Sequence, residues 1–155
     1  MIIRFGQGTS YVSRLIVAQE KTSMPFTPSH VEAVMPDGKW LGAHIDGGVQ
    51  ARDPGYDKAT MAHELFLTLP ATTDQDQTFY AFLEKHIGEP YDWHAILGFI
   101  LPRHEHTPEH AICSALIALS LRACGWFQWP LAAPAHLISP RDLLVIISGR
   151  LAVPM

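Results

Sequence analysis

A segment of the chain, residues 111–121, is apolar except for Ser114 and Ser120. A helix that is apolar on nearly every side belongs in a protein core rather than on a surface. Cys113 lies at the start of this segment, where unpaired backbone N–H groups favour negative charge and therefore a thiolate. Most free cysteines are only small buried apolar side chains. The segment therefore predicts a core helix, and it makes Cys113 a candidate nucleophile.

The second cysteine, Cys124, lies eleven residues further along the same predicted helix. This separation is about 16 Å along a helix axis, which is too long for a disulfide. We therefore expect two free thiols and a reducing compartment. The first residues, MIIRF, lack the features of a secretory signal peptide. We expect a cytoplasmic protein, or one that a phage or a secretion system delivers.

The length of 155 residues suits one domain, residues 1–155, that is large enough to bury a core. A hydrophobic content of 48% with 17% charged residues excludes a disordered chain. The net charge of −4 gives no reason to expect a nucleic-acid partner. No apolar run reaches the roughly 18 residues of a transmembrane helix. The sequence favours no particular oligomeric state.

The pattern of apolar residues predicts an α+β fold in which an antiparallel sheet packs against helices. Strands are expected over residues 29–35, 39–45, 49–52 and 63–69. Helices are expected after Thr9-Ser10, after Thr72 or Thr73, from Asp92 to Leu101, over the cysteine segment, and from Pro140. Pro36-Asp37-Gly38 is a strong turn signal between the first two strands.

Two histidines lie on the hairpin that this turn would close. If residues 36–38 form the loop, paired residue numbers add up to 74, and His30 lies opposite His44 on the same face. A cysteine nucleophile needs a base, which His30 could supply, and His44 could orient the His30 ring. Glu32 is the alternative orienting group, because residues i and i+2 of a strand share a face. Its carboxylate could accept a proton from His30 Nδ1.

The order of these motifs resembles that of the circularly permuted papain-like hydrolases. These form the permuted branch of the NlpC-type cysteine peptidases, with YiiX-like proteins and, more distantly, the lecithin–retinol acyltransferase group. In that branch the histidine strand precedes the nucleophile helix, as it does here. The resemblance is carried by Ser29-His30-Val31, Ala43-His44, Gly88-Glu89-Pro90-Tyr91-Asp92, Cys113-Ser114 and the closing segment 137–143.

The resemblance implies a permuted papain-like fold and a hydrolase that cleaves an amide or ester bond through a thioester acyl-enzyme, with no cofactor or metal. Cys113 would be the nucleophile, and its backbone N–H would contribute to the oxyanion hole. His30 would be the base and later the acid, with His44 in the position of the second histidine. Family members commonly have Gly after the His-Val pair or an acidic residue after the Cys-Ser pair. This chain has Glu32 and Ala115 there, which leaves substrate selectivity open.

The expected substrates are a peptide, peptidoglycan or an acyl group, with cell-wall peptide as the first expectation. We expect Ser29 and Tyr91 to contact the substrate, and Tyr56 could also line a cleft. The histidine-rich segment 103–110 could ligate zinc through His104, His106 and His110, but we expect it to be a solvated cover. The alternatives are a catalytically silent binding or structural module of the same fold, and a lipid acyl hydrolase or acyltransferase.

Overall fold

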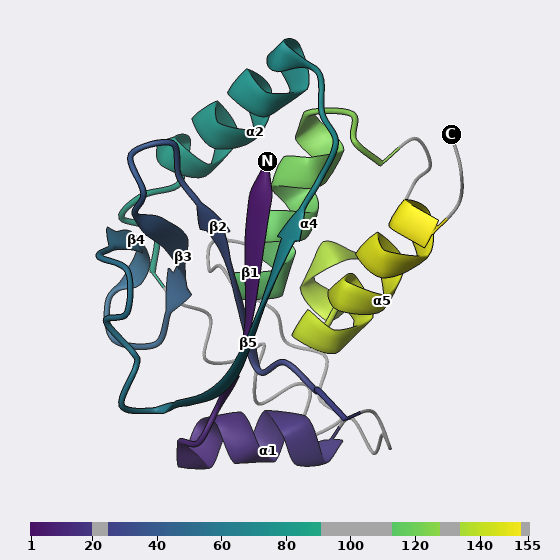
Figure 1. Ribbon diagram of the computed structural model, residues 1–155. Helices are drawn as coiled ribbons and strands as arrows, with labels where there is room; N and C mark the ends of the chain where they lie inside the picture. Colours follow the sequence, from purple (N-terminus) through teal and green to yellow (C-terminus); the bar gives the residue numbers. More distant parts are fainter. Residues whose placement is uncertain (20–24, 91–112, 128–133, 153–155) are drawn as a thin grey trace.

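The computed structural model describes residues 1–19, 25–90, 113–127 and 134–152. It has the predicted α+β architecture, with five antiparallel strands in the order β4-β3-β2-β1-β5 (Figure 1). The strands are β1 Ile2–Gly8, β2 His30–Val34, β3 Trp40–His44, β4 Gly48–Arg52 and β5 Met61–Thr68. The helices are α1 Tyr11–Gln19, α2 Thr73–Lys85, α4 Cys113–Ala123 and α5 Pro140–Ala152, with a 3₁₀ turn at Ala135–Leu137.

Strand β1 is not among the strands expected from the sequence, yet it lies inside the sheet between β2 and β5. Ile3 and Phe5 are fully buried in the core, and Arg4 between them is also fully buried. Arg4 lies opposite Glu32 on β2 and opposite Phe66 on β5. Because a buried arginine requires charged partners from elsewhere in the fold, the local sequence gives little sign of this strand.

One face of the sheet is covered by α2, α4 and α5. Helix α4 lies against β2 and β3, and it also contacts α2 and α5 (Figure 1). Eight of the eleven residues of α4 are buried, which confirms the predicted core helix. In the described part of the chain, no helix is both long enough and apolar enough to cross a membrane.

The hairpin of β2 and β3 has the predicted register. Ala33 pairs with Leu41 and Val34 with Trp40, so that paired residue numbers add up to 74. The loop is closed by the Met35 N–H, which donates to the Lys39 carbonyl at 2.8 Å. The rings of His30 and His44 lie next to each other, with centroids 5.1 Å apart. The turn therefore brings the two histidines together as expected.

Three helices begin where their caps predict. The Thr72 hydroxyl accepts the Gln75 N–H, and the Gln75 side chain accepts the Thr72 N–H, forming a capping box at α2. The Ser10 hydroxyl caps α1 in a similar way, and α5 begins at Pro140. The helix expected from Asp92 to Leu101 lies outside the described residues.

Gly48 allows a close approach between β4 and the segment after α2. It has a φ of +72°, and a Cβ there would meet the Glu89 carbonyl group. Two backbone bonds hold this contact: Val49 N–H to Glu89 O and Gly88 N–H to Val49 O, each 2.8 Å. The close spacing of these groups depends on a residue without a side chain at position 48.

Gly48→Ala should therefore destabilise the fold more than Gly38→Ala, which provides a matched control. Gly38 also has a positive φ, of +87°, but no atom lies within 4 Å of a Cβ built there. We expect Gly38→Ala to lower the free energy of unfolding by about 1–2 kcal/mol. Gly48→Ala should lower it by about 1–3 kcal/mol more, because of overpacking against the backbone. Urea denaturation measures both, and equal losses would contradict a rigid contact with Glu89.

Candidate active site

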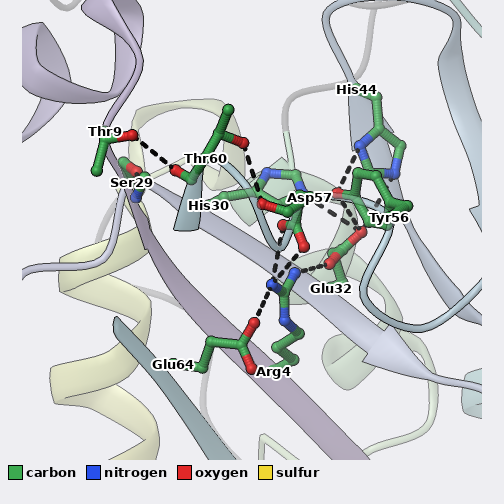
Figure 2. A network of polar contacts seen from close by, with 11 residues as sticks. Arg4, Thr9, Ser29, His30, Glu32, His44, Tyr56, Asp57, Thr60 and Glu64 are labelled. Atoms are coloured by element: carbon green, nitrogen blue, oxygen red, sulfur yellow. Dashed lines mark hydrogen bonds and ion pairs between the residues drawn. The ribbon is translucent and has the colours of Figure 1, made fainter. Parts of the chain in front are cut away.

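Three polar side chains gather on the sheet face opposite the helical core. Val31 and Ala33 of β2 point into the core, so His30 and Glu32 point to the other face. His44 joins them from the end of β3 (Figure 2). Glu32 is fully buried, His44 is buried, and His30 is half-buried. The strand alternation and the hairpin register together place these residues side by side.

Glu32 contacts both histidines, so the two orienting groups considered from the sequence belong to one cluster. Its Oε1 atom lies 3.2 Å from His44 Nε2 and 3.5 Å from His30 Nε2. The Tyr56 hydroxyl donates to the same oxygen at 3.0 Å and lies 3.3 Å from His44 Nδ1. The expected contact through His30 Nδ1 is wrong, because the ring presents Nε2 to the carboxylate.

A buried arginine holds the other side of Glu32. The Arg4 guanidinium bonds Glu32 Oε2 through Nη1, and through Nη2 it bonds Asp57 (2.8 and 2.9 Å) and Glu64 (2.7 Å) (Figure 2). It also lies 4.0 Å from the centre of the Trp40 ring. Three carboxylates therefore surround one cation and fix the position of Glu32. The sequence did not predict Arg4, Asp57 or Glu64 as site residues. The one local signal for them was an arginine within the apolar run at the start of the chain.

The ionisation of His30 and Glu32 is strongly coupled. Burial lowers the pKa of His30, but its interactions with Glu32 and Cys113 outweigh burial and raise this pKa to about 10. Burial raises the pKa of Glu32, but its histidine neighbours, His30 above all, hold it well below its usual range. At neutral pH the pair is therefore an imidazolium beside a carboxylate.

The neighbours of this pair stay neutral. Burial and the positive charge of His30 lower the pKa of His44, although Glu32 acts in the opposite direction. Burial and the nearby charge of Glu32 raise the pKa of Tyr56. His44 and Tyr56 therefore contribute ring edges and hydrogen bonds to the cluster, and His30 carries the positive charge.

Cys113 is the first residue of α4, and the fold brings it to His30. The two side chains lie close enough for Cys113 to raise the pKa of His30. Cys113 is 5% exposed, and both cysteines are free thiols as predicted. Cys124 lies just beyond the other end of α4, where its thiol donates to the Leu121 carbonyl at 3.3 Å and burial raises its pKa. The two thiols thus have similar exposure but opposite electrostatic surroundings.

No protein-family model matches the chain, and no curated protein does. The family membership inferred from the motif order therefore stays a prediction.

A cavity of about 170 Å³ opens to solvent beside the histidines; its lining includes His30, His44, Ser29, Tyr56, Asp46 and Arg52. Ser29 was expected to contact substrate, and it does line the cavity. Its hydroxyl accepts the Gly8 N–H at 3.0 Å, which ties the start of β2 to the end of β1. Tyr91 and the histidine-rich segment 103–110 lie outside the described residues.

Proposed function

We propose that the protein is a cysteine hydrolase of the permuted papain-like type, which cleaves an amide or ester bond through a thioester acyl-enzyme. The observation that carries the proposal is the placement of Cys113, at the start of a buried helix and close enough to His30 to raise its pKa. The contact of His30 with the buried carboxylate of Glu32 supports it. The motif order that resembles the permuted NlpC-type peptidases points to the same function.

Each member of the cluster has a separate role in this proposal. A protonated His30 favours the thiolate form of Cys113, and the thiolate is the nucleophile. Because His30 Nε2 faces Glu32, Nδ1 is the ring nitrogen left to exchange a proton with Cys113 or with the leaving group. Glu32 acts through His30 and is therefore a positioning residue, held in place by Arg4 and Tyr56.

The reaction proceeds in two stages. The Cys113 thiolate attacks the carbonyl carbon, and the electron pair of the carbonyl bond moves to oxygen, where the Cys113 backbone N–H at the helix start would donate to it. The C–N or C–O bond then breaks as His30 gives its proton to the leaving amine or alcohol. In the second stage, water attacks the thioester while His30 takes a proton from the water. Loss of the thiolate releases the acid and restores the original ion pair.

Alkylation of the two cysteines tests the proposal without a known substrate. An ordinary thiol, with a pKa of about 8.5, is only about 0.3% thiolate at pH 6. Iodoacetamide at pH 6 should therefore modify Cys113 at least tenfold faster than Cys124, as measured by peptide mass spectrometry. The two side chains are 5% and 8% exposed, so accessibility does not favour either one. Equal, slow labelling would reject the nucleophile and favour a binding module without turnover.

The first substrates to test are cell-wall peptides, because many of the NlpC-type peptidases that the motif order resembles act on them. If Cys113 is the nucleophile, a chain that cleaves such a peptide should accumulate a thioester with a mass increase confined to the Cys113 peptide. Acid quenching should preserve this adduct, and hydroxylamine should remove it.

A further inference from the structure

Two imidazole nitrogens at the site are buried without a hydrogen-bond partner. Among the described residues, neither His30 Nε2 nor His44 Nε2 forms a hydrogen bond, although both lie near Glu32 Oε1. A buried polar atom that stays unpaired is costly, and native structures have few of them. The ligand atoms of His30, Glu32 and His44 all lie within 4.8 Å of one another. Three ligand atoms this close together could hold a metal ion.

We propose that His30, Glu32 and His44 together bind one divalent transition-metal ion, with Zn²⁺ as the ion that fits best. Imidazole nitrogen and carboxylate oxygen are ordinary zinc ligands, at about 2.0–2.2 Å from the ion. Two ligands at that distance in a tetrahedral site lie about 3.3 Å apart. The measured distances from Glu32 Oε1 to the two Nε2 atoms, 3.2 and 3.5 Å, lie on either side of this value.

The charge around the three ligands also suits a cation. Once His30 has lost a ring proton to bind the ion, Glu32, Asp57 and Glu64 carry three negative charges against the single positive charge of Arg4. A divalent ion would balance the difference of two. Arg4 occupies Oε2 of Glu32, which leaves Oε1 directed toward the two rings. A group that orients a ligand in this way usually strengthens a metal site.

The site is preorganised and lies beside an open cavity. His30 and His44 come from two paired strands of the sheet, so their backbones are fixed relative to each other. Both residues also line the open cavity, so the ligand group lies beside solvent-accessible space. Three protein ligands leave the fourth position of a tetrahedral ion open to water, as in catalytic zinc sites.

Bound zinc would switch off the proposed hydrolase, and this consequence, unlike the binding itself, rests on the proposed function. Coordination of His30 Nε2 replaces the proton on that nitrogen by the ion and confines the remaining ring proton to Nδ1. The ring could then no longer take a proton from Cys113 or from water. The His30–Glu32–His44 cluster would thus make the thiol chemistry sensitive to free metal ions.

The test is a titration of the metal-free full chain with Zn²⁺ and, separately, with Co²⁺. We expect one ion per chain by equilibrium dialysis with metal analysis, and a visible Co²⁺ spectrum of tetrahedral intensity. His44→Ala and Glu32→Gln should each weaken Zn²⁺ binding at least tenfold. His86→Ala is the matched control, because His86 Nε2 also lies near a carboxylate, Glu89 at 3.9 Å, but away from this cluster. It should leave the affinity unchanged.

Other results would overturn the metal site. These are the absence of stoichiometric binding at micromolar Zn²⁺, and binding that survives both His44→Ala and Glu32→Gln. Loss of binding in a His104→Ala/His106→Ala variant would assign the ion to the histidine-rich segment instead. Cys113→Ser separates this proposal from the hydrolase. It should keep the Co²⁺ spectrum, so a failed alkylation test would leave the metal site standing, and a failed titration would leave the nucleophile standing.

Discussion

Arg4→Met is expected to lower the free energy of unfolding by about 3–5 kcal/mol, as measured by urea denaturation. Methionine can fill much of the space of the arginine beside Trp40, but it supplies no charge in place of the guanidinium over that ring. Glu32 would stay fully buried, and Asp57 and Glu64 beside it would lose their shared cation. Removing one partner of a buried ion pair costs more than the pair contributes, because the remaining charge stays out of water.

Arg52→Met is the matched control for this variant. Arg52 also pairs with a carboxylate, Asp46 at 2.6 Å, and it also lies over an aromatic ring, Tyr56 at 4.7 Å. Asp46 is 74% exposed, however, so its charge stays solvated when the arginine is removed. We expect a loss of about 1 kcal/mol or less. Equal losses in the two variants would show that the Arg4 network contributes no more than a surface ion pair.

This network also marks the limit of what the sequence could predict. The hairpin register followed from a local signal, the turn at Pro36-Asp37-Gly38, and the α4 core helix followed from its apolar run. The partners of Arg4, by contrast, lie 28, 53 and 60 residues away along the chain. No local pattern links them, and the strand that carries Arg4 was missed for the same reason. Ion pairs between residues so far apart in the chain can be predicted only once the pairing of the strands is known.

The orientation of His30 shows a second limit. Strand alternation predicted correctly that His30 and Glu32 share a face. It could not predict which ring nitrogen meets the carboxylate, since rotation of an imidazole about its χ2 bond is broad and is set by its neighbours. Here Tyr56, His44 and Arg4 all converge on Glu32 and determine where its oxygens point.

His30→Ala should slow the alkylation of Cys113 by roughly 10- to 100-fold at pH 6. With the pKa of His30 raised to about 10, the ring is protonated below pH 10 and places a positive charge beside the sulfur. Without that charge, the thiolate fraction at pH 6 falls toward the 0.3% or so of an ordinary thiol. Part of this loss is offset, because a less stabilised thiolate is a stronger nucleophile.

The dependence of the rate on pH distinguishes loss of the ion pair from general damage to the fold. In the wild type, the Cys113 rate should rise less steeply between pH 6 and 8 than the rate of an ordinary thiol, because His30 stays protonated throughout this range and favours the thiolate. In His30→Ala it should rise about tenfold per pH unit, as the rate of an ordinary thiol does below its pKa.

Cys124, buried at the far end of α4, reports on the fold in the same sample, and its rate should be the same in both proteins. His86→Ala should behave as wild type. A wild-type Cys113 rate that rises tenfold per pH unit would mean that His30 does not activate this thiol.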